Sequence, residues 1–167
     1  MDQLTIEPKK GIGNIKLGMT EAEVEECLQY YTDRYEITYE KNPECYHAPG
    51  TIRRSFSFEY DADGKVTFIQ IVSSLQDVLA CVFQNMDVFR TKAEELIPAI
   101  DNLSRYDRDH SELGYTYEFP ELGLSFWRSN ILTEADLQAE WFQELRPEIQ
   151  EDEKKFLYFE CASIRSV

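Results

Sequence analysis

Residues 11–31 read GIGNIKLGMTEAEVEECLQYY and combine a glycine turn, a short strand and the start of a helix. Thr20 and Glu23 have the spacing of a capping box, in which the hydroxyl accepts from a first-turn amide and the carboxylate accepts from the amide of the cap residue. The residues that recur at the spacing of one helix face are Val24, Cys27, Leu28 and Tyr31. This stretch therefore predicts a capped amphipathic helix against which the rest of the chain packs.

Length and composition indicate a single globular domain over residues 1–167, with 43% hydrophobic and 13% aromatic residues. The four cysteines, Cys27, Cys45, Cys81 and Cys161, are far apart and contain no CxxC pair. We therefore expect reduced thiols, with neither a zinc site nor a redox motif. No cofactor is predicted.

The charge balance is strongly acidic, with 32 acidic against 17 basic residues and a net charge of −15. Such a field repels nucleic-acid phosphates and anionic lipids and attracts basic protein surfaces. Solubility alone is the simpler explanation for the charge. The sequence starts with neither a basic segment nor an apolar run, and no apolar stretch approaches the ~18 residues of a membrane span. We therefore expect a cytoplasmic protein that binds neither nucleic acid nor membrane.

Residues 1–10 are predicted to form a short extended arm, and residues 32–50 a long irregular loop with a brief strand at 37–39. Long loops often carry function, which makes this loop the first candidate contact surface. Tyr46 and His47 follow Cys45, but the only other histidine is His110, so no metal site is predicted.

Residues 52–60 and 66–72 are predicted to pair as a β-hairpin, because Phe56, Phe58 and Tyr60 alternate with polar residues and a DADG turn follows. Residues 78–83 suit either a strand or a buried helix, and their β-branched residues favour a strand. A second helix is predicted to begin at Thr91, which forms a capping box with Glu94 and is followed by Pro98 inside the helix.

Two stretches align as a degenerate repeat: FSFEYDADG from Phe56 and YTYEFPELG from Tyr115. They lie 59 residues apart, whereas Thr20 and Thr91 lie 71 apart, so the second unit lacks about 12 residues of loop. Coincidence between two ordinary hairpins is the alternative. The pattern predicts an α+β fold in which two helix-plus-hairpin repeats, 11–72 and 85–130, build an antiparallel sheet with the helices packed on one side.

The string IKLGMTEAEV, residues 15–24, resembles the opening of the small outer-membrane assembly lipoproteins of the SmpA/OmlA (BamE) type. Doubling of a helix-plus-sheet unit is also how the β-lactamase inhibitor proteins are built. The match covers about 15 residues. What the resemblance implies is a protein-binding fold, and no catalytic residue carries over from it.

The closing part, residues 131–167, is predicted to form a helix followed by a strand. Thr133 is the expected cap, Leu137, Trp141 and Leu145 follow one side, and Pro147 ends the helix. Residues 134–155 contain eight acids and three bases, which predicts a negative outer face with a net charge of −5. Residues 156–164 are predicted to form a strand that joins the second sheet.

Motifs of known enzyme classes are absent from the sequence, so we expect a non-catalytic acidic protein-binding module, such as an immunity protein or an inhibitor of a basic bacterial toxin or enzyme. The alternative is a sensor or carrier that binds a small molecule on an aromatic sheet surface. The sequence leaves the oligomeric state and the buried face of the sheet open. The predicted binding surface comprises Tyr39, Tyr46, His47, Tyr115, Tyr117, Trp127, Glu140 and Trp141.

Overall fold

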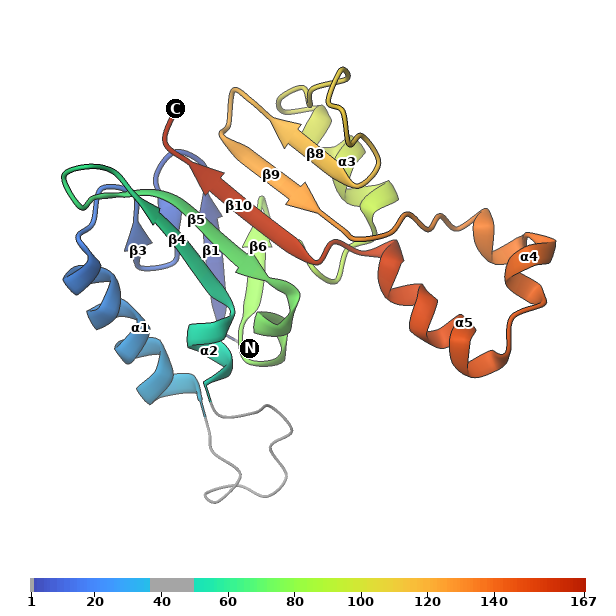
Figure 1. Ribbon diagram of the computed structural model, residues 1–167, viewed down its shortest axis with the longest axis horizontal. Coiled ribbons are helices and arrows are strands. Elements are labelled where there is room, and N and C mark those ends of the chain that lie inside the picture. Colours follow the sequence, from blue (N-terminus) through green and yellow to red (C-terminus); the bar gives the residue numbers. More distant parts are fainter. Residues whose placement is uncertain (1, 37–49) are drawn as a thin grey trace.

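The computed structural model describes residues 2–36 and 50–167, which form two five-stranded sheets (Figure 1). The larger sheet is antiparallel throughout. Its strands, in spatial order, are β4 (Phe56–Tyr60), β5 (Val66–Val72), β10 (Cys161–Arg165), β9 (Leu124–Trp127) and β8 (Thr116–Phe119). The two predicted hairpins therefore belong to one sheet, and the C-terminal strand lies between them.

The smaller sheet has a parallel pair at its centre, formed by β1 and β6. Its strands, in spatial order, are β3 (Ile15–Lys16), β2 (Gly11–Ile12), β1 (Gln3–Glu7), β6 (Ala80–Phe83) and β7 (Met86–Asp87). The strand predicted within 78–83 is confirmed as β6. The extended arm predicted for residues 1–10 is wrong, because residues 3–7 form the central strand of this sheet.

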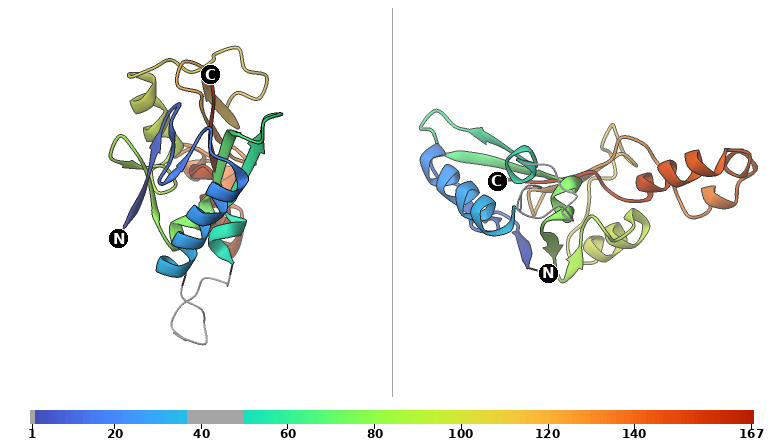
Figure 2. Two further views of the ribbon diagram at one scale, coloured as in Figure 1. Left: turned by 90° about the vertical axis from the view of Figure 1, so that its left-hand side faces the viewer. Right: turned by 90° about the horizontal axis from the view of Figure 1, so that it is seen from below.

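The two longest helices are α1 (Glu21–Tyr35) and α3 (Ala93–Asp101). Both lie on the same side of the larger sheet as the smaller sheet, as the right-hand view of Figure 2 shows. Helices and antiparallel-rich sheets confirm the predicted α+β fold, with the helices on one side. The shorter helical segments are α2 (Thr51–Arg54), η1 (Ser73–Asp77), η2 (Asp136–Gln138), α4 (Glu140–Gln143), α5 (Pro147–Glu153) and η3 (Lys154–Leu157).

Apart from the short helix α2, the order of elements is the same in the two halves of the chain: β2, β3, α1, β4, β5 in the first and β6, β7, α3, β8, β9 in the second. The strands β1 and β10 each pair with both halves and so join them. An internal repeat of residues 11–72 and 85–130 at the level of sequence stays a prediction.

The core lies between the larger sheet and the layer formed by α1, the smaller sheet and α3. Cross-strand register sets which side chains enter it. Ile71, Ala162 and Phe126 are neighbours across β5, β10 and β9, and all three are buried. The adjacent inward row runs through Phe58, Ile69, Ile164, Leu124 and Phe119.

The start of α1 is as predicted. The Thr20 hydroxyl accepts from the Glu23 amide at 3.3 Å, and the Glu23 carboxylate accepts from the Thr20 amide at 2.8 Å. The second predicted capping box is wrong, because α3 begins after Lys92 and has no side-chain cap. Thr91 lies outside that helix, and the Glu94 carboxylate accepts instead from the Glu134 amide at 2.8 Å.

The bounds of the loop predicted for residues 32–50 are wrong at its N-terminal end, because α1 continues to Tyr35. Residues 51–54 form α2, so the first hairpin begins at Phe56 and not at Ile52. Tyr39, Tyr46 and His47, with the brief strand predicted at 37–39, lie outside the described residues.

Residues 129–160, here called the arm, connect β9 to β10 and extend away from the ends of these strands (Figure 1). The single helix predicted here is wrong: η2, α4 and α5 replace it, and Pro147 begins α5 because proline suits the first turn of a helix. Thr133 and Asp136 form reciprocal hydrogen bonds, but the turn that follows is short. The buried aromatic residue is Phe142, which packs with Leu132 and Leu157 in a cluster separate from the main core.

Candidate functional site

The outward side of the larger sheet, here called the open face, is the side opposite α1, α3 and the smaller sheet. In the described part of the chain no helix lies over it, and Figure 1 shows this side toward the viewer. Alternation along the strands gives its residues: Ser57, Glu59, Phe68, Gln70, Val72, Thr116, Glu118, Ser125, Trp127, Cys161, Ser163 and Arg165. A sheet face without a covering layer is available for contact with another molecule.

The middle of the open face is small and polar. Ser163 lies between Gln70 on β5 and Ser125 on β9. Larger side chains stand on either side of this strip, with Trp127 beside Cys161 in one direction and Phe68 beside Arg165 in the other. The face is therefore polar in its middle and bordered by larger side chains, and Ser163 at its centre is only 8% exposed.

An exposed apolar cluster borders the open face at the end of β9. Leu113, Tyr115 and Trp127 are 38%, 40% and 41% exposed and line a hollow of about 320 Å³. Two of these residues, Tyr115 and Trp127, were predicted as contact residues, and the fold brings them together. Contiguous exposed aromatic residues of this kind are typical of interaction surfaces.

The arm carries the second part of the candidate site. Glu140 and Trp141 lie side by side on α4, and both are exposed, Trp141 to 51%. Glu144 follows directly after α4 and is also exposed. The arm therefore presents an indole group among carboxylates on a segment with a net charge of −5 over residues 134–155.

Tyr117 does not belong to this surface. Its ring points into the molecule, 5.2 Å from the ring of Tyr106 and 5.9 Å from that of Phe159. The register explains the difference, because Tyr117 stands opposite the buried Phe126 whereas its neighbour Thr116 stands opposite the exposed Trp127. Burial raises the pKa of Tyr117, so its hydroxyl remains protonated at neutral pH.

Arg128 is a residue that the sequence analysis missed, and it joins the arm to the sheet. It is 3% exposed, and its guanidinium donates to the carbonyls of Gly114 at 3.0 Å, Leu132 at 3.3 Å and Phe156 at 2.9 Å. The last two carbonyls lie at the two ends of the arm. Alternation along the sequence LSFW indicates the direction of Arg128. Because Trp127 points outward, the next residue is expected to point inward.

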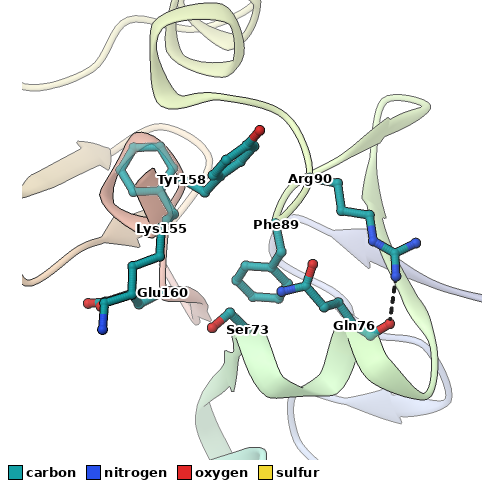
Figure 3. A pocket seen from close by; sticks show the side chains of 8 residues that line it. Ser73, Gln76, Phe89, Arg90, Lys155, Tyr158 and Glu160 are labelled. Carbon is teal, nitrogen blue, oxygen red and sulfur yellow. Dashed lines mark hydrogen bonds between the residues drawn. The ribbon is translucent and has the colours of Figure 1, made fainter. Parts of the chain in front are cut away.

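A further hollow of about 280 Å³ lies where the arm returns to the body (Figure 3). Phe89 and Arg90 precede α3, and Tyr158 ends the arm's last helical turn. Arg90 donates to the Gln76 carbonyl at 3.1 Å, which directs its guanidinium toward η1 in Figure 3. The hollow combines hydroxyl, amide, basic and acidic groups, but the described chain contains no nucleophile hydrogen-bonded to a base there.

His110 is held in the loop before β8 by contacts with two glutamates. Its Nδ1 accepts from the Glu112 amide at 3.1 Å, and its Nε2 lies 3.6 Å from the Glu118 carboxylate. Over the described residues, no group of three or more histidine, cysteine or acidic side chains is placed to hold a metal ion.

The chain matches no known protein family, no characterised protein and no solved structure. The resemblance to outer-membrane assembly lipoproteins and β-lactamase inhibitor proteins therefore stays a prediction. Within residues 2–36 and 50–167, no helix has the length and apolar character needed to cross a membrane.

Proposed function

We propose that this chain is a non-catalytic, cytoplasmic, acidic protein-binding module that masks a basic partner, as an immunity protein or an inhibitor of a basic bacterial toxin or enzyme does. The observation that carries the proposal is a face of the larger sheet that no described helix covers, beside an acidic arm. Trp127 is exposed on the sheet and Trp141 on the arm. The net charge of −15 supports a basic partner.

The two parts of the surface have different physical roles. Carboxylates of the arm attract a basic protein over a distance of about one Debye length, ~8 Å at physiological salt, and so raise the association rate. Exposed tryptophans supply the desolvated contacts that keep a complex together, because aromatic residues dominate the energetics of interfaces. Charge changes on the arm are therefore expected to change the association rate. Removal of an indole is expected to raise the dissociation rate.

The test is to recover the partner by cross-linking in the native cell and then to measure its association with variants. Glu140→Lys/Glu144→Lys reverses two exposed charges on the arm. We expect the association rate at low salt to fall by roughly tenfold, and the difference to shrink as salt is added. Stopped-flow mixing or surface plasmon resonance measures both rates.

The matched control is Glu21→Lys/Glu26→Lys, which makes the same change in net charge on exposed positions of α1. This variant should associate nearly as fast as the unmodified protein. Equal slowing by both pairs would mean that only the overall charge matters, and an unchanged rate for the arm variant would contradict the proposed surface.

A further inference from the structure

A hollow of about 470 Å³ lies between α3, β8 and the start of the arm, on the inner side of the sheet and separate from the open face. Its apolar walls come from Ile97 and Pro98 on α3 and from Ile131. Tyr106 and Tyr117 add two aromatic rings in an edge-to-face arrangement. Concave apolar sites with a few polar groups are the usual form of small-molecule sites.

Arg128 also lines this hollow, and Glu94, which lines the same hollow, favours its charge without forming an ion pair with it. Across the described residues, no carboxylate oxygen lies within 4.0 Å of its guanidinium. Its hydrogen bonds to protein use Nε and Nη1, and Nη2 donates to no described residue. Arg128 is 3% exposed, and its charge is met by three carbonyls and by the ring of Phe159, whose centre lies 5.6 Å from the guanidinium carbon. A bound anion would add the ion pair that these contacts lack.

Arg128 contributes to the wall of this hollow and also to that of the hollow beside Trp127. The pKa of Arg128 is lowered by burial, and the groups that oppose this effect are Tyr117 and Glu94, both of which line the hollow. The hydroxyls of Tyr106 and Tyr117 form no hydrogen bond within the part of the chain that the structure describes. One guanidinium nitrogen and two phenols are therefore open donors.

Two acidic groups that also line the hollow, Glu94 and Asp101, limit the charge of the ligand. Asp101 is held by both terminal nitrogens of Arg108, at 2.6 Å and 2.7 Å, and Glu94 accepts from the Glu134 amide. These carboxylates already have partners, but their charge still disfavours phosphates and other multiply charged anions. A single carboxylate is the anion that the site tolerates best.

We infer that the hollow between α3, β8 and the arm binds a small monocarboxylate with an apolar or aromatic body, whose carboxylate pairs with Arg128. The aromatic and aliphatic walls contact the body of the ligand, and the phenols of Tyr106 and Tyr117 donate to its oxygens. This inference is independent of the proposed masking of a basic partner, because it uses the inner side of the sheet.

The test is a titration of the intact protein with 3-phenylpropionate and with 3-phenylpropionamide, the neutral analogue of the same shape. Nuclear magnetic resonance follows the Nε–H signal of Arg128 and the ring signals of Tyr117. Charge-assisted hydrogen bonds are about twice as strong as neutral ones, so we expect the acid to bind at least about tenfold more tightly than the amide. The shifts should be confined to the residues around the hollow.

Loss of Arg128 would also release the arm, so the site is tested with variants of Pro98, which is exposed on α3 and lines the hollow. Pro98→Trp should abolish binding by placing an indole over the opening, whereas Pro98→Ala should retain it. Equal affinity for acid and amide, binding that survives Pro98→Trp, or no movement of the Arg128 signal at the solubility limit of the acid would each overturn the inference.

Discussion

The two halves of the molecule share an order of elements but differ in how their main helices are held. In the first half, α1 has 15 residues, a complete capping box and an acidic outer side, and it buries Val24, Leu28 and Tyr31. In the second half, α3 has 9 residues and no side-chain cap, and it buries four residues: Ala93, Leu96, Ile97 and Ile100. Local signals stabilise the first helix, and packing stabilises the second.

The arm accounts for much of this difference. It begins beside the N-terminus of α3, where Glu134 pairs with Lys92 and its amide donates to Glu94. The carboxylate that would complete a cap with Thr91 is therefore used to hold the arm. The capping-box pattern is sufficient to cap the helix in the first half. In the second half it is overridden by the hydrogen bond between Glu94 and Glu134, which lie 40 residues apart along the chain.

The largest expected effect on the free energy of unfolding comes from core residues of α1 and α3, because both helices pack into the same main core. Leu96→Ala should lower the free energy of unfolding by about 2–5 kcal/mol, because Leu96 is fully buried. Leu28→Ala should cost less within that range, since Leu28 keeps 7% exposure. Urea denaturation followed by fluorescence and circular dichroism measures both changes.

The same experiment tests whether the halves unfold together. A single main cluster contains residues of both helices and both sheets, so each variant should show one cooperative transition with an unchanged denaturant slope. Two separated transitions, one sensitive to Leu28 and one to Leu96, would show instead that each half has its own core.

A smaller and more local effect is expected in the arm. Phe142 packs with Leu132 and Leu157 in a separate cluster. Phe142→Ala should therefore remove hydrogen-exchange protection from α4 and α5 while the free energy of unfolding of the main core changes by less than about 1 kcal/mol. The control is Trp141→Ala, because Trp141 is the exposed neighbour of Phe142. This variant should keep its hydrogen-exchange protection in α4 and α5. Loss of protection throughout the sheets in Phe142→Ala would show that the arm is part of the main core.

Sequence reasoning predicted the elements whose signals are local. The cap at Thr20, the pair of strands around the Asp61–Gly64 turn and the strand at 80–83 are all present. It failed where a long-range partner decides the structure. Gln3–Glu7 pairs with the nearby β2 at its end and with β6, almost 80 residues later, at its start, and this second partner is not visible from the local sequence. In the arm, a helical pattern broke into short pieces because its buried residues are few: Leu132, Phe142 and Leu157 form a small cluster, and Phe159 joins the main core.

The candidate site was predicted only in part for a related reason. Alternation does not show which face of a strand is covered, so Trp127 is grouped with Tyr117, whose ring is turned inward. It also places Tyr115 with Tyr117, but Tyr115 precedes β8 and is exposed. Arg128 was missed because an arginine is ordinarily a surface residue, and nothing in the sequence shows that three carbonyls converge on it.

The smallest expected effect on stability comes from the caps, and it compares the two similar sequence patterns, Thr20 with Glu23 and Thr91 with Glu94. Thr20→Ala should lower the free energy of unfolding by about 1 kcal/mol, because it leaves a first-turn amide of α1 without its acceptor. Thr91→Ala, the matched change in the second half, should have no such cost, since Thr91 does not cap α3. Differential scanning calorimetry at neutral pH measures both variants against the unmodified protein.

The pH dependence of Thr20→Ala gives a second test. Hydrogen bonds from the amide and hydroxyl of Thr20 lower the pKa of Glu23 in the folded protein. A carboxylate whose pKa is lowered by folding stabilises the protein above its unfolded pKa, and this contribution disappears as the pH falls through the folded pKa. The difference between Thr20→Ala and the unmodified protein should therefore shrink under acidic conditions, while Thr91→Ala stays level with the unmodified protein at every pH. An equal loss of stability in the two variants would mean that Thr91 also caps its helix in solution and that the arm does not compete with it.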